Sequence, residues 1–149
     1  MNSLSIIGCG NAARTLARLW LDAGIFQIAG ILNSTPASSR EAVAFIGAGE
    51  AVASVSRLPS ADIILIGCPD DRIRSCCEAL AAGGPLADST VVFHLCGALS
   101  SSELSAARDA GAAVAGIHPI RSFAEPAAAI GNFAGTWCGC EGDTAALQL

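Results

Sequence analysis

The hydrophobic residues of this chain follow two alternating patterns. Short continuous apolar runs, such as Ile-Ile-Leu-Ile at 63–66, alternate with segments in which apolar residues recur every three or four positions. Buried parallel strands are apolar on both faces and their crossover helices are amphipathic, so this alternation predicts an α/β protein with a doubly wound parallel sheet. The predicted strands are 4–8, 26–32, 51–55, 62–67, 90–95 and 112–117, with a last edge strand at 135–140, and the predicted helices are 11–23, 40–46, 71–82 and 102–110.

The first strand leads directly into the pattern G-x-G-x-x-A, and a helix follows at once. Gly8 would permit the tight turn, Gly10 would let the backbone approach a pyrophosphate, and Ala13 would keep the helix close to the sheet. The free N–H groups and the dipole at a helix start favour an anion. This placement predicts a Rossmann NAD(P)-binding fold with three α/β/α layers, and the alternative is a glycine-rich turn in another α/β domain.

Composition agrees with this fold class. A chain of 149 residues fits one domain, and its apolar mass is small and aliphatic, since aromatic residues make up 5% and tyrosine is absent. The net charge of −5 argues against a broad nucleic-acid surface. No apolar run approaches the roughly 18–20 residues needed to span a bilayer, and the start of the chain lacks a basic region or cleavage site. We therefore expect a cytoplasmic protein.

Seven cysteines raise the question of disulfides or a metal. Their number is odd and their spacing matches no disulfide framework, which favours reduced thiols. Cys138-Gly-Cys140 and His94-Leu-Cys96 lack the paired spacing of a zinc site, so no metal is expected.

Cofactor preference is indicated at the end of the second strand. A site that prefers NAD usually has Asp or Glu there, on the ribose 2′-hydroxyl. This chain instead has Asn33, Ser34 and Thr35, with Arg40 shortly after. Their donors and positive charge would accept a 2′-phosphate, which favours NADP over NAD. The alternative is an Asx-type turn followed by a solvated arginine.

Three further segments follow strand ends, where ligands of open α/β sheets bind. The first contains Cys68, Pro69, Asp70 and Asp71, and the others contain the two histidines of the chain, His94 and His118. Histidine exchanges protons near neutral pH, so either could act as a general acid or base, although each could equally be structural. The two aspartates precede a helix and are predicted to cap it.

The motifs GCGNAA, CPDDRI, FHLCGALSS, GIHPIRSFA and GTWCGCEGD resemble those of one group of NADP-type oxidoreductases. These are Rossmann-like proteins followed by a helical domain of unknown function, and they are related to pyrroline-5-carboxylate reductase, deazaflavin-dependent NADP reductase and prephenate dehydrogenase. The resemblance implies that Gly8, Gly10, Asn11 and Ala12 hold the pyrophosphate, that Asn33 and Ser34 face the ribose, that Cys68, Pro69 and Asp70 flank the middle of the cofactor, and that His94 and His118 stand near the nicotinamide.

Two departures from the family pattern stand out. Cys96 occupies a position where serine is usual, and the chain ends at Leu149, where the family continues into a helical domain that covers the substrate and pairs subunits. The sequence is then either a truncated piece or a module that stands alone. A segment at 123–137 with a single charge would form an exposed apolar patch of the kind found at interfaces, and a homodimer is expected.

The leading hypothesis is an NADP-dependent oxidoreductase, or its cofactor-binding domain, that moves a hydride between the nicotinamide and a small carbonyl or imine substrate. His118 would be the general acid or base, with His94 as a polar support or second proton donor. The alternatives are a non-catalytic dinucleotide-binding or assembly module, and a methyltransferase. The methyltransferase is disfavoured because an acid normally holds the ribose hydroxyls at the end of the second strand, and here it is missing.

Overall fold

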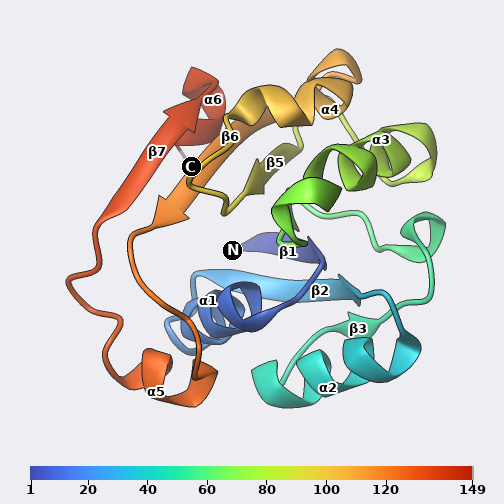
Figure 1. Cartoon of the computed structure of the whole chain (residues 1–149). Helices are drawn as coiled ribbons and strands as arrows, with labels where there is room; N and C mark the ends of the chain where they lie inside the picture. The colour runs from blue at the N-terminus through green and yellow to red at the C-terminus, as the bar shows by residue number, and fades with distance from the viewer. Residues whose placement is uncertain (149) are drawn as a thin grey trace.

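A seven-stranded sheet with the strand order β3-β2-β1-β4-β5-β6-β7 forms the centre of the protein (Figure 1). The computed structural model describes residues 1–148. Every neighbouring pair is parallel except β6 and β7, which are antiparallel. The strands are β1 (Asn2–Ile7), β2 (Phe26–Leu32), β3 (Glu50–Ala51), β4 (Ile63–Ile66), β5 (Val91–His94), β6 (Ala113–Pro119) and β7 (Cys138–Gly142). The predicted doubly wound α/β fold is confirmed.

Helices cover both faces of the sheet (Figure 1) and enclose two hydrophobic cores. Side chains of α1 and α2 pack on one face and those of α3 and α4 on the other, while the strand residues 63–66 between them are wholly buried. The helices are α1 (Asn11–Asp22), α2 (Pro36–Ile46), α3 (Ile73–Gly83), α4 (Ser105–Asp109), α5 (Pro126–Gly131) and α6 (Thr144–Leu147), with 3-10 turns η1 (Val55–Arg57), η2 (Asp70–Arg72) and η3 (Ser101–Leu104).

Several predicted boundaries are corrected by the structure. Helix α2 starts at Pro36 instead of residue 40, because Thr35 caps it by accepting a hydrogen bond from the Ser38 N–H at 3.1 Å and proline suits the first helical turn. The strand predicted at 51–55 has only the two residues of β3, and a 3-10 turn follows. The edge strand lies at Cys138–Gly142 instead of 135–140, and α5 and α6 were not predicted.

The predicted capping role of Asp70 and Asp71 is also corrected. Both residues lie inside η2, and Arg72 occupies the N-cap position of α3 without a side-chain cap. The helix therefore begins later than residue 71, after an extra 3-10 turn at the strand end. In the segment predicted as an exposed apolar patch, 123–137, Trp137 is 82% exposed, whereas Phe123, Ile130 and Phe133 are half-buried. Ile120, which lies just before that segment, is 64% exposed.

Among residues 1–148, no helix is long and apolar enough to cross a membrane. The same residues contain no group of three or more His, Cys, Asp or Glu side chains arranged to hold a metal ion.

Candidate functional site

The turn between β1 and α1 is packed so tightly that only glycine fits its first position. Gly8 has a positive φ of 81°, and its N–H donates to the Leu32 carbonyl at 2.8 Å. A Cβ at Gly8 would fall on the backbone of Cys68, in the loop after β4. A Cβ at Gly67 would lie 2.9 Å from the Cβ of Ala13, which is itself buried. The turn is thus held between β2, β4 and the start of α1, as a close helix–sheet packing requires.

The second glycine of the motif faces open space instead. Gly10 is the N-cap residue of α1, where no side chain caps the helix, and a Cβ built on it would meet nothing within 4 Å. The free N–H groups of the first helical turn and the space above them fit a phosphate group. Ala12 is half-buried in that turn, and Asn11 reaches away from it, since its side-chain amide donates to the Ala124 carbonyl at 3.3 Å.

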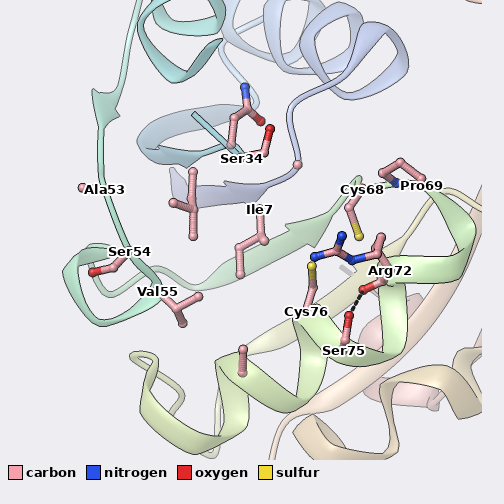
Figure 2. A pocket seen from close by; sticks show the side chains of 14 residues that line it. Ile7, Ser34, Ala53, Ser54, Val55, Cys68, Pro69, Arg72, Ser75 and Cys76 are labelled. Atoms are coloured by element: carbon pink, nitrogen blue, oxygen red, sulfur yellow. Dashed lines mark hydrogen bonds between the residues drawn. The ribbon is translucent and has the colours of Figure 1, made fainter. Parts of the chain in front are cut away.

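A cavity of about 610 Å³ adjoins the glycine-rich turn at the carboxyl ends of β1, β2 and β4 (Figure 2). Five of the residues predicted for the site line it, whereas Gly10, Asn11, Ala12, Thr35, Arg40 and Asp70 do not. The five are Gly8, Asn33, Ser34, Cys68 and Pro69. The cavity therefore brings together three segments far apart in the sequence.

The sequence analysis missed the opposite wall of this cavity. The segment Ala53–Val55 after β3 and the residues Arg72, Ser75, Cys76 and Ala79 around the start of α3 complete the lining. Arg72 is the one charged side chain among the lining residues, and Figure 2 shows its guanidinium beside the sulfurs of Cys68 and Cys76. A signal was present in the sequence, because Arg72 stands at the start of a helix that follows a strand end in a parallel sheet.

Asn33 uses its side chain to join the loop after β2 to the glycine-rich turn. Its Oδ1 accepts from the Cys9 N–H at 2.6 Å, and its Nδ2 donates to the Ser38 carbonyl at 2.9 Å. Since Thr35 caps α2, the donors that face the cavity from this region are those of Ser34. Arg40 is exposed on α2 outside the cavity lining.

The two histidines lie at the ends of neighbouring strands but differ in their surroundings. His94, at the end of β5, is fully buried, and its Nδ1 accepts from the Cys96 N–H at 3.1 Å. Its Nε2 must then carry the proton, which it donates to the Ser100 carbonyl at 3.1 Å. Both nitrogens are occupied by backbone groups, so the geometry of His94 is that of a structural histidine.

His118, near the end of β6, is half-buried and keeps one nitrogen available. Its Nδ1 donates to the Leu95 carbonyl at 3.0 Å, and its Nε2 has no hydrogen-bond partner among residues 1–148. The ring lies against Gly97, since a Cβ at Gly97 would be 2.6 Å from Nε2. A fixed ring with a free Nε2 can donate or accept a proton.

Asp70 and Cys96 connect the loops that follow β4 and β5. The Cys96 sulfur accepts a hydrogen bond from the Ala98 N–H at 3.3 Å, and the thiol interacts with the Asp70 carboxylate. Burial, followed by the contact with Asp70, raises the pKa of the Cys96 thiol. Cysteine at the position where the family usually has serine therefore still makes a polar contact here.

Comparison with known proteins agrees with this geometry. Residues 3–93 match the family described as NADP oxidoreductase, coenzyme F420-dependent, which supports a nicotinamide cofactor. A search of curated proteins finds no match.

Solved structures with the same fold include one described as an oxidoreductase and two reductases. A Bacteroides fragilis protein described as an NADP oxidoreductase is 17% identical with a TM-score of 0.76, and the match covers 96% of this chain and 52% of that chain. An imine reductase of Bacillus cereus is 19% identical with a TM-score of 0.73, covering 98% and 49%. A pyrroline-5-carboxylate reductase of Coxiella burnetii is 13% identical with a TM-score of 0.73, covering 97% and 50%. The chain thus spans about half the length of these proteins.

Proposed function

Because this chain belongs to the family of coenzyme F420-dependent NADP oxidoreductases, we propose that it binds NADP and forms the cofactor-binding part of an oxidoreductase. The main support is the open backbone at Gly10, next to a cavity lined by Ser34 and Arg72. A helix start without a side-chain cap suits a pyrophosphate, and the cavity beside it has room for the adenosine.

The preference for NADP over NAD is part of this proposal. The cavity lining contains no carboxylate, which an NAD site would use to hold the ribose 2′-hydroxyl. Ser34 can donate to a 2′-phosphate, and Arg72 can neutralise its charge. Arg72 takes over the role that the sequence analysis gave to Arg40. Asn33 lines the same wall and bonds to the glycine-rich turn, and Thr35 supports the wall from outside the lining by capping α2.

His118 is the residue proposed to move a proton in the reaction. When bound, the nicotinamide supplies or accepts the hydride. Reduction of a carbonyl or imine builds electron density on its oxygen or nitrogen, and an imidazolium can protonate that atom from Nε2. The bond from Nδ1 to the Leu95 carbonyl keeps the ring in place, and Gly97 leaves room for it. His94 is better suited to position residues 94–101, because backbone groups occupy both its nitrogens.

The proposal also covers the substrate class and the assembly of the protein. The imine and pyrroline-5-carboxylate reductases with this fold reduce small C=N compounds according to their names, and we assign a small carbonyl or imine substrate to this protein by analogy. The exposed Ile120 and Trp137 fit a surface covered by a helical domain or a second subunit, which supports a homodimer.

Titration of NADPH, NADH and S-adenosylmethionine against thermal unfolding tests the cofactor assignment. A ligand at about 100 times its dissociation constant adds about 2.7 kcal/mol to the free energy of unfolding. We expect NADPH to stabilise the protein most and S-adenosylmethionine to have no effect. No stabilisation by either nicotinamide dinucleotide would overturn the assignment, and stabilisation by S-adenosylmethionine alone would favour a methyltransferase.

A non-catalytic dinucleotide-binding module is the second candidate. One observation favours it: neither His94 nor His118 belongs to the lining of the described cavity. NADPH binding by a full-length protein that oxidises NADPH with no carbonyl or imine compound would support this candidate.

A further inference from the structure

Two cysteine side chains from different elements meet in the wall of the cavity. Cys68 lies in the loop after β4 and Cys76 lies on α3, and both line the cavity, where Figure 2 shows their sulfurs on the same side. The two thiols interact, and each changes the pKa of the other. Neither residue is fully buried, so small reagents can reach them from the cavity.

Arg72 adds a positive charge to this pair. Its guanidinium lies beside both sulfurs (Figure 2), and it interacts electrostatically with each of them. The interaction with the Cys68 thiol and the charge of Arg72 outweigh burial and lower the pKa of Cys76 to about 7. The interaction with Cys76 raises the pKa of Cys68, so Cys76 loses its proton first. No carboxylate lines the cavity to oppose this charge.

The other cysteines differ from this pair. Cys9 and Cys77 are buried, and burial raises the pKa of the Cys9 thiol to about 12 and also raises that of Cys77. Cys138 is exposed on β7, where burial and the neighbouring Cys140 raise its pKa. A reactive thiol needs both access and a stabilised thiolate. Only Cys76 is shown to combine the two among the described residues.

We propose that Cys68 and Cys76 form an oxidisable dithiol in the cofactor cavity, which hydrogen peroxide converts to a disulfide. The Cys76 thiolate attacks one peroxide oxygen, the O–O bond breaks, and hydroxide leaves, which gives a sulfenic acid at Cys76. The Cys68 sulfur then attacks the Cys76 sulfur, its proton goes to the departing oxygen, and an S–S bond forms as water leaves. In total, two thiols lose two electrons and one peroxide becomes two waters.

This dithiol links the oxidation state of the protein to occupancy of the cavity. A bound dinucleotide would cover the two sulfurs and slow their reaction, a consequence that rests on the proposed function. The oxidation itself depends only on the two thiols and on Arg72. The oxidation and the protection by a bound dinucleotide can therefore be tested separately.

Peroxide treatment followed by mass spectrometry of the protein tests the dithiol. In the reduced protein at neutral pH, we expect iodoacetamide to alkylate Cys76 about tenfold faster than Cys138, because its lowered pKa increases the fraction present as thiolate. After peroxide, we expect a peptide in which Cys68 and Cys76 are linked. The variant Cys68→Ser should instead retain a sulfenic acid at Cys76, trapped by a cyclic diketone, and Cys140→Ser should form the disulfide as the natural chain does.

The remaining outcomes each bear on either the dithiol or the proposed binding of a dinucleotide in the cavity. Alkylation of Cys76 no faster than that of Cys138, or a disulfide confined to Cys138 and Cys140, would overturn the dithiol. NADPH that binds by calorimetry yet leaves the rate of disulfide formation unchanged would overturn the link to the cavity. Disulfide formation in a protein that binds no dinucleotide would support the dithiol and contradict the proposed function.

Discussion

The side-chain oxygen of Asn33 accepts a hydrogen bond from the backbone N–H of Cys9 at 2.6 Å. This bond fastens the end of β2 to the middle of the glycine-rich turn, and the amide nitrogen of Asn33 continues the connection to the Ser38 carbonyl. Asn33 therefore holds the glycine-rich turn in place, and both Asn33 and its neighbour Ser34 line the cavity. Substitution of Asn33 is therefore expected to change both the cofactor preference and the free energy of unfolding.

Replacement of Asn33 by Asp should shift preference from NADPH toward NADH, because the new carboxylate repels a 2′-phosphate and can accept from the ribose hydroxyl. The variant should also lose about 1–3 kcal/mol of unfolding free energy, since the Ser38 carbonyl loses its donor. Calorimetric titration and urea unfolding measure the two effects. Ser34→Asp is the matched variant, with the same shift and no loss of stability expected. Unchanged selectivity in both variants would contradict the NADP assignment.

The two glycines of the turn should respond differently to substitution. Gly10→Val should abolish binding of NADPH and leave the fold intact, because the new side chain enters space that is open in the protein and is needed by the pyrophosphate. Gly8→Ala should destabilise the protein by about 1–3 kcal/mol or more, since its φ is positive and the Cβ would strike Cys68. Ligand titration measures the loss of NADPH binding in Gly10→Val, and thermal unfolding measures the loss of stability in Gly8→Ala. A Gly10→Val protein that binds NADPH normally would remove the turn from the site.

Substitution of His118 should affect turnover and substitution of His94 should affect stability. In a full-length protein with a substrate, His118→Asn should lower kcat by about 10²–10⁴-fold and leave NADPH affinity nearly unchanged, because the amide can replace the Nδ1 donor but not Nε2. His94→Ala should cost about 2–5 kcal/mol, since it opens a hole and leaves the Ser100 carbonyl unpaired. If the His118 variant loses stability and keeps its specific activity, His118 is a structural residue.

Arg72 and Arg40 offer a direct comparison of two cations near the cavity. Arg72→Met should weaken NADPH binding by about 10- to 100-fold and NADH binding by less, because a charged hydrogen bond to the 2′-phosphate is lost. Arg40→Met should change neither, since Arg40 does not line the cavity. Calorimetric titration of both variants with both nucleotides checks this. Equal effects of the two substitutions would assign the phosphate contact to a different group.

Stability should fall in acid partly through Asp143. The Val114 N–H, and after it the Arg108 guanidinium, donate hydrogen bonds that lower the pKa of the Asp143 carboxyl below its ordinary value of 3.8. A lowered pKa stabilises the folded state above the ordinary value, and this contribution is lost as pH falls through the lowered value. The difference in unfolding free energy between the natural chain and Asp143→Asn should therefore be present at neutral pH and shrink below about pH 4. A difference independent of pH would show that the charge of Asp143 does not contribute.

Much of the fold was determined by local sequence patterns. The apolar runs located β2 to the residue and β4 closely, because strands buried on both faces tolerate few polar residues. The glycine spacing located the tight turn between β1 and α1, since its backbone requirements are local. Boundaries were missed where polar residues offered competing hydrogen bonds: Thr35 started α2 early, and the segment 70–72 formed a 3-10 turn before α3.

The composition of the site depended on tertiary structure. The sequence placed Arg72 after a strand end, at the edge where the site lies. Whether Arg72 and Cys76 would face Ser34 depends on how α3 crosses over the sheet. The two histidines occupy similar positions in the sequence pattern, and only packing separates them: two backbone partners enclose His94, whereas one partner and Gly97 leave the Nε2 of His118 free. The sequence by itself determined the α/β fold and the glycine-rich turn after β1, which follow from the hydrophobic period and from the backbone freedom of glycine. Only the tertiary structure decided which charges, thiols and ring nitrogens face the cavity or solvent, because side-chain surroundings are built from segments far apart in the chain.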